Sequence, residues 1–243
     1  MFLLFPIFRR LLYLAIFVAI LAVAGELLAR KLIGDAVSHA VAARIGVSPK
    51  VGFGSTPLVI QIIHGSLGDV TVKAADAHLD GLGPLALDGT LRDVHLRSLT
   101  SLQGAIGSLQ VRAGVPPSTV RGMLATPACE RSLPSSVQAG LSTAARVAIF
   151  PGRVDLLPPH GRAAEVRLRP YASNDAVRFA IIAIELGGAE VPPAQLRADS
   201  AGANCSRALS NLPFGVGLVS AQALDGTLEL SFSGRDASFS AIG

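Results

Sequence analysis

The sequence predicts an α+β fold in which a curved antiparallel sheet wraps around long helices, preceded by one N-terminal hydrophobic helix. Three observations predict it: an apolar run near the N-terminus, a helical pattern directly after it, and several segments in which apolar and polar residues alternate. Half of the 243 residues are hydrophobic and only 16% are charged, which excludes a disordered chain and requires a large apolar interior.

The N-terminal segment has the features of an export signal. Arg9 and Arg10 precede an apolar run that ends at Gly25, somewhat shorter than the roughly 20 residues that cross a bilayer squarely. Ala22-Val23-Ala24 matches the small-x-small pattern of a signal-peptidase site. Two interpretations stay open: a signal peptide cleaved near Ala24, and an uncleaved signal-anchor transmembrane helix.

In both interpretations the arginines stay inside and the rest of the chain is exported. We therefore divide the chain into residues 1–25, the signal or anchor, and residues 26–243, one exported domain. The apolar residues of the segment 26–45 recur with helical spacing and form one face, and Gly46 and Pro49 end the pattern. Such a helix is about 30 Å long, enough to lie along a whole sheet.

A short helix and the first long strands are predicted in residues 53–97. Thr56-Pro57 can cap and start a buried helix that ends before Gly65. Alternation then predicts strands around Val70 and from Leu85 to Leu91, with a turn at residues 81–84.

The alternation of apolar and polar residues shifts by one position after Leu91 and continues with Val94 and Leu96. A one-residue bulge near Arg92-Asp93 would bring these apolar residues back to the same face of the sheet. Such a bulge also bends the strand, which favours a curved sheet. Later strands are predicted around Leu109, around Val166 and from Thr227 to Ser233.

Three later segments complete the chain. Pro116-Pro117 and Pro192-Pro193 each open a predicted short helix, and residues 137–148 predict a weak helix or a helix followed by a strand. Residues 177–184 are apolar on both faces, so that strand is either buried on two sides or has one face on protein and the other on a ligand.

Two cysteines, Cys129 and Cys205, are expected to pair in an exported protein. Neither lies in a Cys-x-x-Cys pattern or beside a histidine, so no metal site is predicted.

Catalytic and nucleic-acid-binding signals are absent from the sequence. The five histidines have no metal-ligand spacing, and there is no Gly-x-Ser-x-Gly elbow and no phosphate-binding glycine loop. The formal net charge is only +4 and tryptophan is absent, which disfavours stacking on nucleic acid. We therefore predict that the protein is not an enzyme and uses no cofactor.

The segment Pro57-Leu58-x-x-Gln61-x-x-x-Gly65, which leads into Val70-x-Val72, resembles the LmeA-like phospholipid-binding family of actinobacterial cell envelopes. Residues 212–216 (Leu-Pro-Phe-Gly-Val) and 224–230 resemble that family's C-terminal turn and last strands. The similarity runs from about residue 26 to the end, and it implies a fold of the tubular lipid-binding type that binds lipid without transforming it.

From these patterns and the resemblance we predict an apolar groove for acyl chains and a polar mouth for the headgroup. The groove is expected to be lined by Val59, Ile63, Val70, Val72, Phe179, Ile182 and Ile184. Arg92, Arg97 and Arg178 are expected to bind the phosphate of the headgroup.

The resemblance implies anionic membrane phospholipid as the partner, a location at the extracytoplasmic face of the cell envelope, and a supporting role in envelope glycolipid synthesis, with an envelope glycosyltransferase as a possible protein partner. The alternative is a membrane-anchored scaffold domain with a filled core that binds an envelope enzyme. A folded chain with an elongated apolar cavity favours lipid binding, and a close-packed core favours the scaffold.

Overall fold

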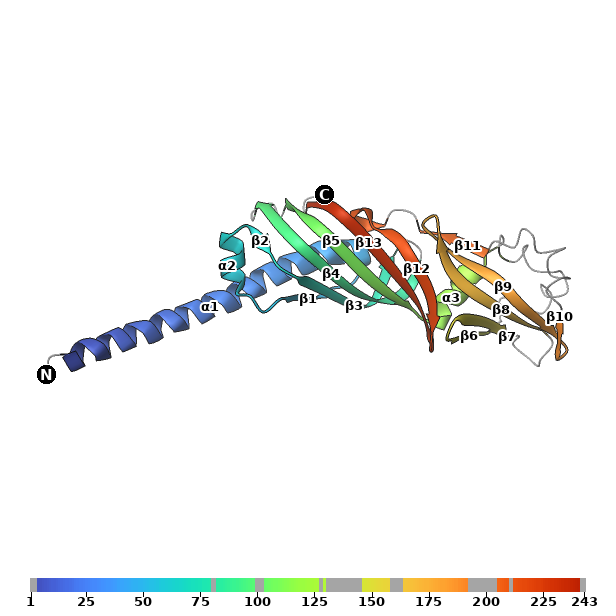
Figure 1. Ribbon diagram of the computed structural model, residues 1–243, viewed down its shortest axis with the longest axis horizontal. Coiled ribbons are helices and arrows are strands. Elements are labelled where there is room, and N and C mark those ends of the chain that lie inside the picture. The colour runs from blue at the N-terminus through green and yellow to red at the C-terminus, as the bar shows by residue number, and fades with distance from the viewer. Residues whose placement is uncertain are drawn as a thin grey trace.

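A computed structural model describes residues 4–79, 82–98, 103–126, 129, 146–157, 164–191, 205–209 and 212–240. These residues form an α+β structure with two antiparallel sheets, so the predicted class is confirmed at that level. The molecule is elongated: a long N-terminal helix leads into one sheet, and the second sheet lies at the other end (Figure 1). One helix in the described part is long, and it lies against the first sheet.

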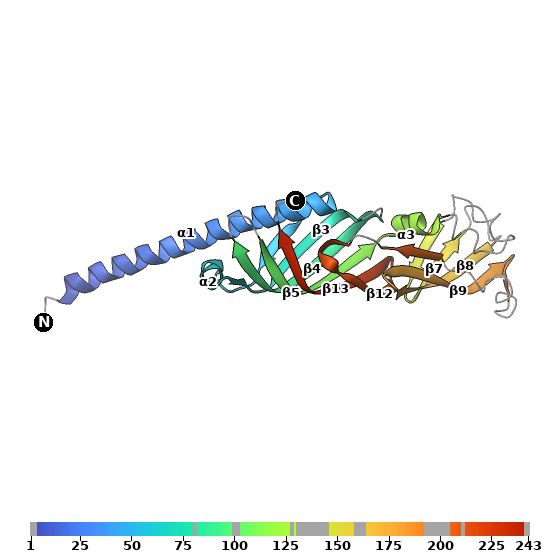
Figure 2. The same cartoon turned by 90° about the horizontal axis from the view of Figure 1, so that it is seen from above.

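The long helix, α1, covers Leu4–Ile45 and ends where Gly46 adopts a left-handed backbone with φ of +75°. Its C-terminal half lies along the first sheet, and its N-terminal half projects beyond it as a stem (Figures 1 and 2). The predicted division between residues 25 and 26 falls inside α1. Within the described residues, no helix combines the length and the apolar character needed to cross a membrane.

The first sheet has seven strands and receives α1 on one face. Its strands are β1 (Lys50–Phe53), β2 (Ser66–Leu67), β3 (Val70–Leu79), β4 (Leu82–Ser98), β5 (Gln103–Val115), β12 (Gly217–Leu224) and β13 (Thr227–Ser240). Their order is β1-β3-β4-β5-β13-β12, and β2 pairs with β4. The N- and C-terminal parts of the chain therefore build one sheet together.

The apolar residues of β4 change position at Asp93, but without the predicted one-residue bulge: the β4–β5 register runs unbroken from Arg92–Ser108 to Val94–Ile106, and three strands make the step together. In β4, Leu91 and Val94 both face inward, and Asp93 between them has φ of +54°. Asp236 in β13 has φ of +52°, and both aspartates lie opposite Gly107 of β5. A Cβ on Gly107 would come within 2.9 Å of the Asp93 Cβ, so glycine is required where the strands make this step.

The second sheet has six strands and contains the segment that is apolar on both faces. It is built from β6 (Arg146–Phe150), β7 (Arg153–Leu157), β8 (Ala164–Ser173), β9 (Ala176–Leu186), β10 (Ala189–Val191) and β11 (Cys205–Ala208). The order is β10-β9-β8-β7-β6, and β11 pairs with β9. Helix α3 (Pro117–Leu124) begins after Pro116 as predicted and packs between the two sheets.

Cys129 and Cys205 form a disulfide, as the sequence predicted, between the segment after α3 and the start of β11. Both cysteines are buried in the large hydrophobic cluster that the second sheet shares with α3, with the end of α1 and with strands β3, β4, β5, β12 and β13 of the first sheet. The bond therefore fastens the outer strand of the second sheet to the interior.

Some local predictions need correction. Helix α2 (Leu58–Ile63) forms where expected, but Thr56 provides no side-chain cap and much of the helix is exposed rather than buried. Residues 82–84 begin β4 instead of forming a turn. Residues 146–148 belong to β6, while the rest of the predicted helix at 137–148 and the one after Pro192 lie outside the described residues.

Candidate functional site

An apolar groove lies between α1 and the face of the seven-stranded sheet that α1 covers. It encloses about 110 Å³ and its surface is almost entirely apolar. The lining comes from α1, four strands and the segment 212–216: Val37, Val41, Ile45, Val72, Leu79, Leu87, Gly89, Leu91, Leu109, Val111, Leu212, Phe214, Val216 and Phe232.

The floor of the groove is a row of residues that lie opposite one another on neighbouring strands. Val72 of β3 pairs with Gly89 of β4, Gly89 with Val111 of β5, and Val111 with Phe232 of β13. A Cβ on Gly89 would lie 3.6 Å from the Val72 carbonyl oxygen and 3.7 Å from Val111 Cγ2. These are ordinary contacts, so the position has room for a side chain. The missing side chain at Gly89 thus contributes open space at the centre of the floor.

One wall of the groove is α1. Val37, Val41 and Ile45 follow at intervals of four residues, so they project from the same side of the helix toward the sheet. Polar contacts at its edge hold the helix in place: the Ser38 hydroxyl donates to the Pro49 carbonyl at 3.1 Å, and the Arg30 guanidinium donates to the Gly54 carbonyl at 3.2 Å.

The segment 212–216 closes another side of the groove. Leu212, Phe214 and Val216 contribute to the lining, and Phe214 has φ of +60° inside the short 3₁₀ turn η1 (Pro213–Gly215). A left-handed backbone is unfavourable for an aromatic residue, so the surrounding packing must hold it there. Gly234 of β13 permits the close approach, since a Cβ at that position would come within 3.0 Å of Val216 Cγ1.

Helix α2 lies at one end of the groove. Leu58 and Ile62 belong to a second hydrophobic cluster, which shares Leu91 and Leu109 with the groove lining. Glu26 of α1 holds the first turn of α2, because its carboxylate accepts the backbone N–H groups of Leu58 at 2.8 Å and of Val59 at 3.1 Å.

Arg30 also binds the Glu26 carboxylate, at 2.6 Å. The bond from the Leu58 N–H, together with those from Arg30 and Val59, holds the pKa of Glu26 below its ordinary value. Glu26 is therefore the capping group that the sequence interpretation assigned to Thr56.

Of the predicted lining residues, Val72 lies in the groove. Val70 is buried in the cluster around α2, and Val59 and Ile63 are exposed on α2. The other three are on β9 of the six-stranded sheet, away from the groove, where Phe179 and Ile184 are buried and Ile182 is half-buried.

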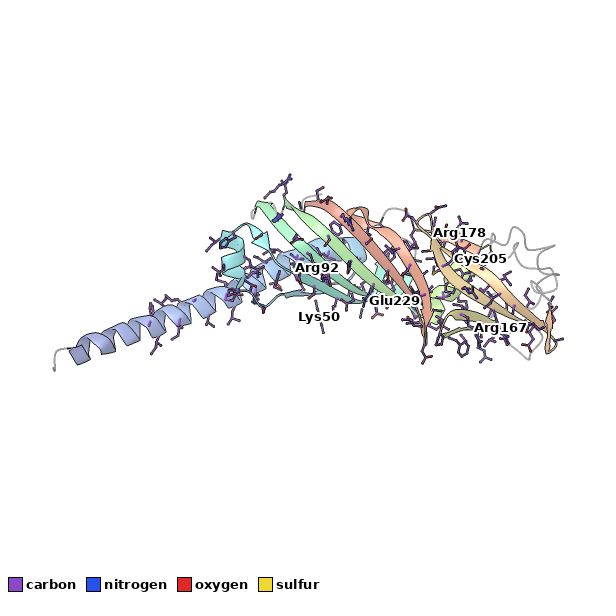
Figure 3. The ribbon with its side chains drawn as sticks, viewed as in Figure 1. Lys50, Arg92, Arg167, Arg178, Cys205 and Glu229 are labelled. Atoms are coloured by element: carbon purple, nitrogen blue, oxygen red, sulfur yellow. A yellow bond between two sulfur atoms is a disulfide. The ribbon has the colours of Figure 1, made fainter. Side chains whose placement is uncertain are left out.

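The three predicted headgroup arginines do not converge. Arg92 lies on the first sheet, with its Nε 3.9 Å from Asp69 Oδ1, and Arg97 is exposed further along β4. Arg178 lies on the second sheet near Cys205 (Figure 3), and its buried Nε has no hydrogen-bond partner among the described residues.

A second cavity, of about 410 Å³, lies between α3 and the start of β4, with Arg207 at its edge. Its surface is partly polar, and the Thr119 hydroxyl inside it donates to the Pro84 carbonyl at 3.1 Å. Because the surface of this cavity is partly polar whereas that of the groove is almost entirely apolar, we assign the functional site to the apolar groove.

The groove is suited to hydrocarbon. Apolar chains gain about 25 cal/mol for each Å² that they remove from water, whereas a charged group would lose its hydration without a partner there. In the described residues, no group of histidine, cysteine or acidic side chains is arranged to hold a metal ion.

The sequence interpretation missed Gly89 and the lining face of α1. A glycine inside an alternating strand is itself a signal, because it marks either a close approach or an unfilled space. The α1 residues were identified as one apolar face, but the pattern does not distinguish a face that packs tightly from one that leaves a groove.

Comparison with known protein families matches residues 24–233 to the LmeA-like phospholipid-binding family. No curated protein and no solved structure matches the chain.

Proposed function

Since the chain belongs to the LmeA-like phospholipid-binding family, we propose that it binds a membrane phospholipid by placing acyl chain in the groove between α1 and the seven-stranded sheet. The observation that carries this proposal is the apolar floor with Gly89 at its centre. A scaffold whose interior is simply filled has no need of such an opening.

The proposal includes a place and a role for the protein. It acts at the extracytoplasmic face of the cell envelope, held there by the N-terminal helix or released after cleavage near Ala24. It shuttles or presents phospholipid, with a preference for anionic headgroups, and so supports envelope glycolipid synthesis beside a glycosyltransferase. The family and the basic, apolar N-terminal segment support this part.

We propose a binding role without catalysis. The family is one of binding proteins, and the groove lining carries no acid, base or nucleophile among its side chains. A tubular arrangement, in which α1 and the sheet together surround the acyl chain, belongs to the same proposal.

The test is to fill the groove from its floor. Gly89→Leu places a side chain into the groove from a position where a Cβ meets only ordinary contacts. The matched control is Gly114→Leu on neighbouring β5: Gly114 lies opposite Ala86 and Glu229, on the other face of the sheet, and a Cβ there also meets ordinary contacts.

The full chain is purified from a bacterial host in mild detergent, and bound phospholipid is measured by native mass spectrometry and by lipid extraction. We expect near-stoichiometric phospholipid with the wild type and with Gly114→Leu, and most of it lost with Gly89→Leu at unchanged thermal stability. Equal lipid content in all three proteins, or no lipid in any of them even after incubation with phospholipid vesicles, would contradict the proposal and favour the scaffold.

A further inference from the structure

Helix α2 presents apolar side chains outward and its one polar side chain inward. Val59, Ile60 and Ile63 are 39%, 49% and 77% exposed. Gln61 is only 8% exposed, and it donates to the Thr56 carbonyl and accepts from the Gly68 N–H. A helix that faces water has the opposite arrangement, so the outer face of α2 is built for an apolar partner.

The stem of α1 beside α2 is also apolar, and on all of its sides. Ile16, Phe17, Val18, Ile20, Leu21 and Val23 are each about half exposed or more. Because successive helical residues point about 100° apart, these side chains surround the helix. A protein partner would cover one side of it, whereas lipid can cover every side.

Contacts with Glu26 fix α2 to the base of this stem. The same carboxylate binds the first two N–H groups of α2 and the Arg30 side chain one turn along α1. Figures 1 and 2 both show α2 beside α1 at the point where the stem leaves the sheet. These contacts hold α2 against the base of the stem, so the exposed apolar residues of the two helices lie on neighbouring elements that are fixed to each other.

We propose that the outer face of α2 is a membrane-contact surface that lies in the outer part of the lipid bilayer beside the α1 stem. The inner face of α2 packs on the hydrophobic cluster that borders the groove. This places the α2 end of the groove at the membrane surface. The inference shares with the proposed function only its membrane setting, since α2 can contact lipid whether or not the groove holds any.

The absence of tryptophan from the chain allows a direct test. Ile63→Trp introduces a single indole on the outer face of α2. As a control, Phe150→Trp introduces a single indole far from α2, at an exposed aromatic residue in the β6 strand of the second sheet. Each full-length variant is reconstituted into vesicles of phosphatidylcholine and phosphatidylglycerol in equal parts, with ordinary or brominated acyl chains.

For Ile63→Trp, we expect blue-shifted emission and loss of most of the fluorescence with brominated lipid. For Phe150→Trp, we expect the spectrum of an indole in water and little quenching. Water-like, unquenched emission from both variants would overturn the inference. A blue shift of Ile63→Trp that grows with protein concentration and ignores bromination would overturn it in favour of a second copy of the chain.

Two further measurements separate this inference from the proposed function. Replacing Ile60 and Ile63 together with serine should leave the lipid content of the purified protein unchanged and slow transfer of fluorescent phospholipid between vesicles several-fold. If Gly89→Leu loses its bound lipid but the fluorescence of Ile63→Trp is not quenched, the proposal that the groove binds lipid stands and the proposal that α2 contacts the membrane is rejected. If the fluorescence of Ile63→Trp is strongly quenched but no purified protein carries lipid, the membrane contact of α2 stands and lipid binding in the groove is rejected.

Discussion

The two sheets are built from similar alternating strands but differ in how their interiors are filled. In the second sheet, Val154, Val166, Leu168 and Ile184 are at most 1% exposed. In the first sheet, the row through Gly89 leaves a groove under α1. The difference teaches that one glycine in a strand, under a helix that lies along the sheet, can leave open space in one sheet while the other sheet is filled.

The largest effect on stability should come from removing the disulfide, which lies in the filled region, that is, the second sheet with its closely packed interior. Replacing Cys129 and Cys205 with alanine should lower the free energy of unfolding by about 4 kcal/mol, because the bond closes a long loop. Denaturant titration of the variant and of the reduced wild type measures it. Bound lipid should stay at the wild-type level, and its loss under conditions where the protein remains folded would show that the two regions are not independent.

The next comparison truncates one leucine in each region. Leu168→Ala, in the filled interior, should cost about 3 kcal/mol through lost contacts and a new cavity. Leu87→Ala, in the groove lining, should cost only about 1 kcal/mol because that side chain already borders open space. Thermal and denaturant unfolding check both values. Equal costs would mean that the groove is packed as tightly as the second sheet.

A smaller, local effect is expected at Glu26. Glu26→Gln keeps the shape and removes the charge, so the amides of Leu58 and Val59 should exchange hydrogen faster while those of β5 stay protected. Because the pKa of Glu26 is lowered in the folded protein, its contribution is present at neutral pH and is lost as pH falls through that lowered pKa. Acidification should therefore release α2 in the wild type, and the same release in Glu26→Gln would contradict this assignment.

The smallest effect is expected at Asp155, in the filled region. It is 2% exposed, one oxygen accepts from Arg153 at 3.1 Å, and the other has no partner among the described residues. Burial raises its pKa, so the ionised form destabilises the fold increasingly as pH rises through that pKa. Asp155→Asn should raise the melting temperature slightly at neutral pH and leave it unchanged in acid. Thermal scans at both pH values measure the difference.

The sequence predicted elements whose causes are local. The alternation of apolar and polar residues predicted the strands around Val70, Leu109 and Val166. Gly46 predicted the end of α1, and Pro116 predicted the start of α3. The expectation that the chain is exported, together with its two cysteines, predicted the disulfide, although sequence distance says nothing about spatial distance. The matching motifs led to the family because they are short stretches of neighbouring residues.

The site was predicted far less well, because it depends on pairing between distant strands. Val111 and Phe232 meet Gly89 only through the order β4-β5-β13, which no single segment encodes. Phe179 and Ile184 looked suited to a cavity because their strand is apolar on both faces, but they fill the interior of the other sheet. The cap at α2 is supplied by Glu26, which lies 32 residues before Leu58.

The continuity of α1 has a mechanical consequence. The same unbroken helix forms the stem and carries Val37, Val41 and Ile45 into the groove. A helix is stiff along its axis, and about 30 Å of it lies between Glu26 and Ile45. Because the contacts of Glu26, Arg30 and Ser38 fix this part of the helix to the rest of the molecule, the stem and the groove wall belong to one rigid rod, and the direction of the stem is set relative to the groove.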